Sequence, residues 1–202
     1  MPLPLSEAIQ AGKYVIRLLE DSCSRICMAG SIRRRKPLVN DVEIVAKPKT
    51  FSQTTLLGQT PMTNTKDLQA RIISLIEKGV LELGPPNPGH TRPPLGPRYY
   101  RLWIPAYKIQ LDLFVVLPPA QWGIIYALRT GPAEFSRYLV TKARRLGMRV
   151  EGGQLWVVKD GMKVMDIPCP TELDFFKALG ERWIPPEQRD QYVRELLKTY
   201  QR

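Results

Sequence analysis

Apolar and polar positions along the first half of the chain follow two different periods. Residues 5–20 and 66–78 carry apolar side chains at intervals of three and four, which predicts two amphipathic helices. Short apolar runs or strict alternation of apolar and polar residues predict strands. These strands are expected at 24–29, 40–47, 80–83 and, with the strongest signal, 107–117.

The pattern changes at two proline-rich places. Residues 84–97, GPPNPGHTRPPLGP, contain too much proline and glycine for regular structure and predict a surface loop between two strands. Pro118-Pro119 marks a change in character, which we interpret as a boundary between domains 1–117 and 118–202. The second domain is predicted to hold helices at 121–128, 132–146, 171–180 and 186–200, and a hairpin at 148–158 that turns at Gly152-Gly153. Together these elements indicate an α+β fold.

Composition narrows the class of protein. The chain has 202 residues, 44% of them apolar, and it contains neither an apolar run long enough for a membrane span nor a signal peptide. Three cysteines and one histidine, without the spacing of a zinc site, are interpreted as buried thiols in a reducing compartment. We therefore expect a cytoplasmic protein, encoded by a bacterium or a phage rather than secreted, with no membrane partner.

The charge balance points to a polyanionic partner. Thirty Lys and Arg residues against nineteen Asp and Glu give a net charge of +11 and a pI near 9.8. A basic protein of this kind favours nucleic acid as its partner, ahead of an acidic membrane surface.

Three carboxylates occupy the polar faces of two predicted strands. Asp41 and Glu43 are two residues apart, so they share a face about 7 Å apart, and Asp112 lies on a second strand that can neighbour the first. Close carboxylates repel unless cations neutralise them, and oxygen ligands of this kind suit Mg²⁺ or Mn²⁺. Two such ions about 3.5–4 Å apart would serve an in-line nucleotidyl transfer. Taken alone, the Asp41 and Glu43 pair is better interpreted as ordinary solvated strand residues, and only the third acid and the Gly-Ser dipeptide before the pair reverse that preference.

A glycine and a serine precede this pair, followed by four basic residues. Gly30 allows backbone amides to approach a phosphate closely, and the Ser31 hydroxyl can donate a hydrogen bond to it. Residues 33–36, RRRK, can supply charge-assisted contacts to anionic oxygens. The order of phosphate-binding turn, basic arm and carboxylates favours a nucleotide site over a solvated basic loop.

These motifs resemble those of the DNA polymerase β superfamily of nucleotidyltransferases, in the order in which that superfamily carries them. The chain shows GSIRR at 30–34, DVE at 41–43 and the distal Asp112. Residues 122–139, WGIIYALRTGPAEFSRYL, and 171–189, TELDFFKALGERWIPPEQR, narrow the resemblance to family X DNA polymerases. It covers nearly the full length.

The resemblance implies a fold and a metal site. Residues 1–117 would form a nucleotidyltransferase palm, a mixed sheet with helices on one face. Residues 118–202 would form a thumb-like nucleotide-selection subdomain, mostly helical with a short hairpin. Asp41, Glu43 and Asp112 would be the catalytic residues, holding two Mg²⁺ ions, with Mn²⁺ as an alternative, and Asp112 would accept the proton of the primer 3′-hydroxyl.

The resemblance also assigns nucleotide contacts, and the chain departs from the family at some of them. Gly30, Ser31, Arg34 and the backbone amide of Asn40 would bind the β and γ phosphates. Thr130 and Gly131 would border the sugar and base. Leu128 and Arg129 stand where the family has a Tyr-Phe pair, Glu43 replaces its usual Asp, and Ala133, Ser136 and Val140 replace polar or arginine contacts. The change at Leu128 and Arg129 bears on selection of the sugar, and the change at Ala133, Ser136 and Val140 bears on fidelity.

A basic helix face would hold DNA. Along 132–146 the apolar positions form a stripe, and cationic or polar side chains lie on another face. The residues expected to contact DNA are Ser136, Arg137, Lys142, Arg144 and Arg145. Trp103, Trp156 and Trp183 are interpreted as core residues rather than base-stacking platforms.

The sequence therefore predicts a small, monomeric family X DNA polymerase. It would add dNTPs to a primer 3′-hydroxyl on primer-template or gapped DNA, filling short gaps in repair. The chain begins about one helix before the Gly-Ser turn, so we expect a minimal form without lyase or upstream DNA-binding domains. Two alternatives stay open: a nucleotidyltransferase that needs no template or uses RNA or a small acceptor, and a nucleic-acid-binding module without catalysis.

Overall fold

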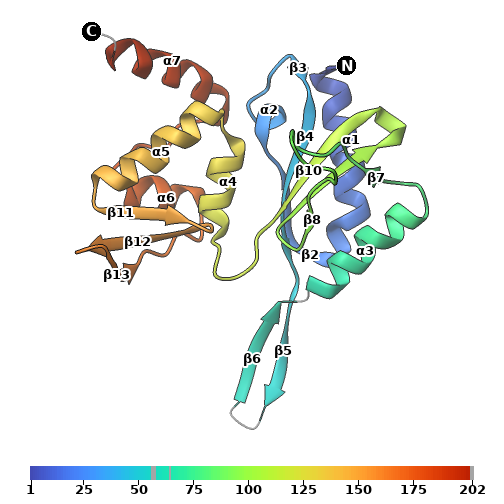
Figure 1. Ribbon diagram of the computed structural model, residues 1–202, viewed down its shortest axis with the longest axis horizontal. Helices are drawn as coiled ribbons and strands as arrows, with labels where there is room; N and C mark the ends of the chain where they lie inside the picture. Colours follow the sequence, from blue (N-terminus) through green and yellow to red (C-terminus); the bar gives the residue numbers. More distant parts are fainter. Residues whose placement is uncertain (56–57, 64, 201–202) are drawn as a thin grey trace. The chain divides into compact units, whose positions relative to one another are not determined.

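The computed structural model describes residues 1–55, 58–63 and 65–200, and the chain separates into two compact units. Unit 1 comprises Met1–Met28 and Pro37–Leu117, and unit 2 comprises Ala29–Lys36 and Pro118–Arg202. Figure 1 labels the elements of both units. The functional assignment of these units as palm and nucleotide-selection subdomain stays a prediction.

Unit 1 is built on a mixed sheet. Its strands follow the order β2-β4-β10-β9-β7, and β8 pairs with β9. β4 and β10 are parallel, whereas the other neighbours are antiparallel. The strands are β2 (Cys23–Met28), β4 (Asp41–Pro48), β7 (Glu82–Leu83), β8 (Leu95–Gly96), β9 (Tyr99–Ile104) and β10 (Ile109–Val115).

One face of this sheet is covered by helix α1. The apolar stripe of α1 (Leu5–Leu19) buries Ala8, Ala11, Val15 and other residues, and the helix packs on β2 and β4. Gly12 lies close to the sheet, because a Cβ at this position would lie 2.5 Å from the sulfur of Met28 and 3.7 Å from Val42. Val42 therefore faces α1, and its neighbours in sequence on β4 face the other way.

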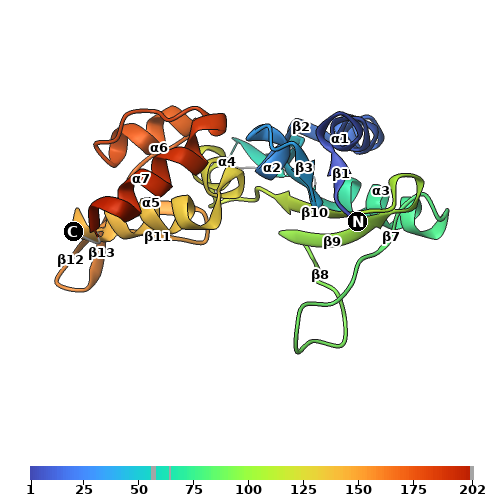
Figure 2. The same ribbon diagram turned by 90° about the horizontal axis from the view of Figure 1, so that it is seen from above.

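The rest of unit 1 consists of one helix, a hairpin and short elements. Helix α3 (Thr65–Glu77) also contacts α1. The hairpin β5 (Thr50–Thr55) and β6 (Gly58–Thr63) extends away from the sheet (Figure 1). The segment between β7 and β9 projects from the sheet (Figure 2). The remaining elements are β1 (Leu3–Pro4), β3 (Leu38–Val39) and the 3₁₀ turns Glu20–Ser22 and Pro105–Tyr107.

Unit 2 packs helices around an aromatic core. Phe135, Phe175 and Phe176 are fully buried together with Ile124 and Leu139. The helices are α2 (Gly30–Arg33), α4 (Trp122–Thr130), α5 (Ala133–Arg145), α6 (Glu172–Ala178) and α7 (Arg189–Tyr200), with a 3₁₀ turn at Pro186–Gln188. An antiparallel sheet is formed by β11 (Met148–Glu151), β12 (Gln154–Lys159) and β13 (Met162–Asp166).

The predicted α+β class and all six predicted helices are confirmed. The prediction missed β9, because the loop that precedes it masked its alternating pattern, and it missed the paired strands β5 and β6 and the third strand β13. The tryptophan interpretation is wrong: Trp103 and Trp156 are half-buried and Trp183 is 42% exposed. The three cysteines are free, and burial raises the pKa of Cys23 to about 11 and of Cys169 to about 12. None of the described helices is long and apolar enough to cross a membrane.

Candidate active site

The strand register of unit 1 places three carboxylates on one face of the sheet. In the parallel ladder Asp112 is paired with Glu43, and Gln110 is paired with Asp41. Paired residues of neighbouring strands point to the same side, about 4.8 Å apart, and alternate residues of one strand share a side. Asp41, Glu43 and Asp112 therefore lie on the face opposite to the one that α1 covers.

Asp112 is held by side chains of the neighbouring strand. Arg101 Nε donates to Asp112 Oδ1 at 3.0 Å and the Tyr99 hydroxyl donates to the same oxygen at 2.9 Å, while Gln110 Nε2 donates to Oδ2 at 3.2 Å. These contacts leave Asp112 only 6% exposed. The Tyr99 ring stacks on Phe114 with centroids 4.9 Å apart, which fixes its hydroxyl beside the carboxylate.

The titration of these partners reflects the buried carboxylate. Burial and the hydrogen bond to Asp112 raise the pKa of Tyr99 to about 12. The hydrogen bond to Asp112 raises the pKa of Arg101. At neutral pH Tyr99 is therefore a hydrogen-bond donor and Arg101 a cation, and both lie against the Asp112 carboxylate.

The donor set fits a magnesium ion in its chemistry. Carboxylate oxygens on adjacent strands are the ligands that Mg²⁺ prefers. Over the part of the chain that the structure describes, no three His, Cys, Asp or Glu side chains form a group ready to hold a metal. Arg101 and Tyr99 share Asp112 Oδ1, so a metal at Asp112 would share or replace these donors.

The predicted phosphate-binding turn belongs to unit 2. It forms helix α2, which follows directly on β2 and starts at Gly30 with φ +55°, a conformation that favours glycine. The Ser31 hydroxyl oxygen is buried and has no hydrogen-bond partner among the described residues. An unpaired buried hydroxyl costs free energy, so Ser31 has the character of a ligand-binding group. The predicted Asn40 lies in unit 1 and is exposed.

A buried carboxylate connects α2 to three other segments of unit 2. Arg33 donates to both oxygens of Glu172, at 2.9 and 2.7 Å, and the fully buried Arg189 donates to Glu172 Oε1 at 2.7 Å. Trp183 Nε1 donates to Glu172 Oε2 at 3.0 Å. Burial alone would raise the pKa of Glu172, but the hydrogen bond from Arg33 and the charges of Arg189 and Arg33 outweigh it and lower the pKa.

Local sequence fixes this carboxylate at the start of α6. The Thr171 hydroxyl accepts a bond from the Asp174 amide at 3.3 Å, and Asp174 accepts one from the Thr171 amide at 2.9 Å. This capping box sets the first turn of α6, where Glu172 lies. Gly123 of α4 packs against the same cap, because a Cβ there would lie 2.0 Å from the Thr171 carbonyl oxygen.

Arg34 lies beside the predicted sugar-binding turn. Its Nη1 donates to the Thr130 carbonyl oxygen, and its Nε donates to Asp190 Oδ2 at 3.1 Å. The Lys36 ammonium lies 3.1 Å from Asp190 Oδ1. Gly131 follows with φ +52°, and a Cβ there would lie 3.4 Å from Arg34 Nη1. The structure thus brings together three of the residues that were predicted to bind the nucleotide: Arg34, Thr130 and Gly131.

The other residues of this turn have separate surroundings. The Thr130 hydroxyl is buried, donates to the Tyr126 carbonyl oxygen at 2.7 Å and accepts from Arg33 at 2.7 Å, so it supports the turn from inside. Leu128 packs against the core of unit 2, whereas Arg129 is exposed.

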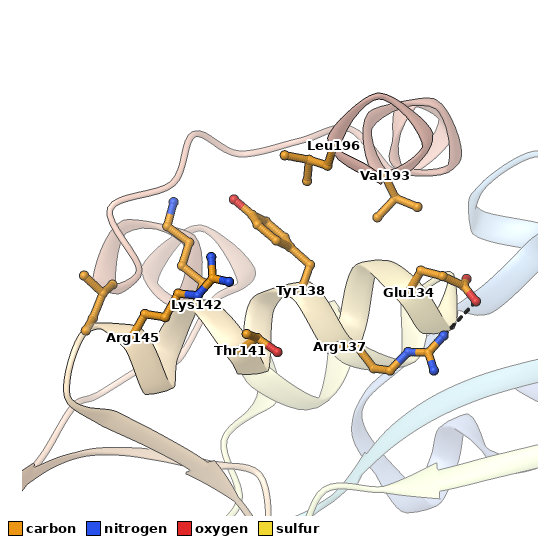
Figure 3. A pocket seen from close by; sticks show the side chains of 9 residues that line it. Glu134, Arg137, Tyr138, Thr141, Lys142, Arg145, Val193 and Leu196 are labelled. Atoms are coloured by element: carbon orange, nitrogen blue, oxygen red, sulfur yellow. Dashed lines mark hydrogen bonds and ion pairs between the residues drawn. The ribbon is translucent and has the colours of Figure 1, made fainter. Parts of the chain in front are cut away.

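The cationic face of α5 borders a groove of about 560 Å³ (Figure 3). Arg137 is 74% exposed and pairs with Glu134 at 2.9 Å, and Lys142 lies 2.5 Å from Glu181. Arg144 and Arg145 are exposed, whereas the Ser136 hydroxyl donates to the Leu128 carbonyl oxygen at 2.7 Å. Residues from α5, Leu146 and α7 line the groove: Glu134, Arg137, Tyr138, Thr141, Lys142, Arg145, Leu146, Val193 and Leu196.

Sequence reasoning missed the residues that hold the predicted ones in place. Arg101 and Tyr99 lie on the unpredicted strand β9, where the alternation of residues 99–104 was the available signal. Glu172 and Arg189 both lie in the motif at 171–189, but nothing in their spacing indicates that their side chains form an ion pair. Asp190 follows that motif and resembles any surface acid.

Comparison with known proteins gives the class of this fold. Residues 126–190 match the family model described as DNA polymerase beta thumb. A search of the curated proteins found no match. Residues 126–190 are thus similar in sequence to a polymerase beta thumb, in agreement with the resemblance seen in the sequence.

Particular solved structures share the fold over most of the chain. The Leishmania infantum polymerase beta ternary P/T complex superimposes with a TM-score of 0.69 at 18% identity, covering 94% of this chain and 77% of that one. The ternary gap complex of the same polymerase gives a TM-score of 0.70 at 18% identity, with 94% and 71% coverage. At this identity the likeness establishes the fold.

Proposed function

We propose that the chain is a DNA-directed DNA polymerase of the family X type, which adds dNTPs to a primer 3′-hydroxyl. The observation that carries this proposal is the register of β4 and β10, which sets Asp41, Glu43 and Asp112 on one face of the sheet. The thumb match and the likeness to polymerase beta structures support it.

In this proposal the carboxylates hold two Mg²⁺ ions, with Mn²⁺ as an alternative. The ions would lower the pKa of the primer hydroxyl and stabilise the leaving pyrophosphate. Asp112 would be placed to accept the hydroxyl proton. Its hydrogen bonds from Arg101 and Tyr99 fix the orientation of the carboxylate, which suits both roles.

The phosphate-binding side chains of the proposal lie in unit 2. Ser31 offers a hydroxyl without a partner among the described residues, and Arg34 offers guanidinium N–H donors beyond the two that bind Asp190 and Thr130. Both are expected of groups that bind the β and γ phosphates. Gly30, Asn40, Leu128, Arg129 and Gly131 complete the proposed nucleotide contacts.

DNA would be held by the basic side chains of α5. Arg137, Arg144 and Arg145 are exposed, so phosphates can reach them. We propose primer-template or gapped DNA as the partner and short-gap filling in repair as the role.

Primer extension on gapped, recessed and single-stranded DNA tests this function. Wild-type protein should incorporate the dNTP that matches the template, and Asp112→Ala should lower incorporation at least a thousandfold while DNA binding is retained. The matched control is Asp166→Ala, which removes an exposed acid of β13.

The outcomes distinguish the proposed function from the two alternatives that the sequence left open. Incorporation indifferent to the template base would favour a template-independent transferase. Incorporation unaffected by Asp112→Ala would exclude the two-metal mechanism. DNA binding without incorporation by the wild type would favour a binding module.

A further inference from the structure

We propose that Asp190 is a positioning residue that orients the Arg34 guanidinium for the triphosphate of the incoming nucleotide. The inference rests on the proposed function, because it assigns a second residue to the same phosphate site. Asp190 would act through Arg34, without touching the nucleotide itself.

Two bonds fix the plane of the guanidinium. Arg34 Nε donates to Asp190 Oδ2 at 3.1 Å, and Nη1 donates to the Thr130 carbonyl oxygen. A guanidinium carries five N–H donors in a rigid fork, so these two partners leave three for a ligand. The side chains of Arg34 and Asp190 are 12% and 19% exposed, which limits their motion and reduces solvent screening of the pair.

Asp190 itself stands on an anchored segment. Its neighbour Arg189 is fully buried and is held by Glu172 at 2.7 Å and by the Ile184 carbonyl oxygen at 3.1 Å. The same Glu172 holds Arg33, the neighbour of Arg34. Arg34 follows Arg33 in the sequence, and Asp190 follows Arg189. Because Arg33 and Arg189 both bind Glu172, this one carboxylate sets the separation of Arg34 and Asp190.

The surrounding groups suit a phosphate ligand. Ser31, whose hydroxyl has no partner among the described residues, precedes Arg34 by three positions, a spacing that places both on one side of a helical turn. Gly131 leaves space beside Arg34 Nη1, where a Cβ would lie 3.4 Å away. Lys36, 3.1 Å from Asp190 Oδ1, adds a second cation.

Preorganisation and charge act in opposite directions here. A fixed guanidinium loses less conformational freedom on binding phosphate than a mobile one. The Asp190 carboxylate, however, repels phosphate. Since Asp190 is bonded to Arg34 and Lys36, its charge is already compensated, and we infer that orientation dominates.

Equilibrium binding of dNTP, dNDP and dNMP to the full chain tests this inference without catalysis. Asp190→Ala and Asp190→Asn should each weaken dNTP binding about tenfold, the loss expected for a charge-assisted contact, and should reduce the preference for dNTP over dNMP. Asp190→Glu, which keeps the carboxylate, should recover part of that loss. In extension assays KM for dNTP should rise more than kcat falls.

The control is Asp166→Asn, which breaks an exposed pair with Lys163 in the same unit and should leave dNTP binding unchanged. Unchanged or tighter dNTP binding by folded Asp190→Asn would overturn the inference, and so would an equal loss for dNTP and dNMP. A wild type whose dNTP affinity falls on substitution of Asp190 but which incorporates no dNTP would contradict the proposed function and leave this inference standing.

Discussion

Glu172 accepts a 2.7 Å hydrogen bond from Arg189, whose side chain is the largest among the fully buried ones of the described residues. The guanidinium carbon of Arg189 also lies 5.1 and 5.3 Å from the rings of Phe135 and Phe176, so the pair sits within the aromatic core of unit 2. Removal of one partner leaves the other as an uncompensated buried charge.

Glu172→Gln should therefore destabilise the protein by about 3–5 kcal/mol, because Arg189 and Arg33 lose their anion. Urea unfolding at pH 7 measures this change. The control Glu151→Gln removes an acid that is 61% exposed and paired with Arg149, and it should cost less than about 1 kcal/mol. Equal effects of the two substitutions would show that the buried network is not a source of stability.

The same carboxylate predicts the response to acid. The folded-state pKa of Glu172 is lowered relative to its unfolded value, so its contribution to stability is present above the unfolded pKa, about 4.3, and is lost as pH falls through the folded pKa. Unfolding free energies between pH 7 and pH 3 should fall more steeply in the wild type than in Glu172→Gln. Parallel pH profiles would contradict this assignment.

Arg101 should compete with metal at Asp112. Arg101→Met removes the cation 3.0 Å from Asp112 Oδ1, so the protein in EDTA should lose about 1–3 kcal/mol of stability, and Mg²⁺ should raise its Tm more than that of the wild type. Differential scanning fluorimetry across a Mg²⁺ titration measures both effects. Arg71→Met, which alters an exposed arginine of α3, is the control. An equal Mg²⁺ response in all three proteins would argue against metal binding at Asp112.

Gly123→Ala should prevent α4 from packing on the cap of α6. The added Cβ would lie 2.0 Å from the Thr171 carbonyl oxygen and 2.3 Å from its carbon, both backbone atoms that cannot move aside cheaply. We expect a loss of at least about 3 kcal/mol in thermal or urea unfolding. Gly96→Ala, where a Cβ would meet nothing within 4 Å, should change stability by less than about 1 kcal/mol.

DNA binding by the α5 surface should depend strongly on salt. The double variant Arg144→Ser and Arg145→Ser should weaken binding to every DNA sequence and reduce the slope of log K against log salt by about 2. Fluorescence anisotropy between 50 and 200 mM salt, roughly the range over which counterion release acts, gives the slope. The control pair Lys13→Ser and Lys78→Ser removes two exposed lysines of unit 1. A slope that changes equally in both doubles would show that bulk charge, and not α5, determines binding.

Local patterns in the sequence predicted elements whose period is set by one buried face. The helix at 5–20 and the strand at 107–117 are examples, because burial against a single partner surface imposes the spacing of their apolar residues. The strands β5 and β6 were missed since their sequences carry no such spacing, and the short β7 could not be delimited within 80–83.

Pairings between residues that are distant in the chain could not be predicted from the sequence. The chemistry of Asp41, Glu43 and Asp112 could be proposed from residue type and alternation, and the strand register agrees with a shared face. Nothing local to Arg33 indicates that its partner is Glu172, 139 positions later, or that Asp190 bridges Arg34 and Lys36. Such contacts depend on the folded path of the whole chain.

The assignment of Ala29–Lys36 to unit 2 means that the chain passes between the two units three times: after Met28, after Lys36 and after Leu117. A gene fragment that starts at Pro118 would omit α2, and with it the Arg33 side chain that binds both oxygens of Glu172. Neither unit therefore corresponds to one uninterrupted stretch of coding sequence, because the eight residues Ala29–Lys36 of unit 2 are encoded within the stretch that encodes unit 1.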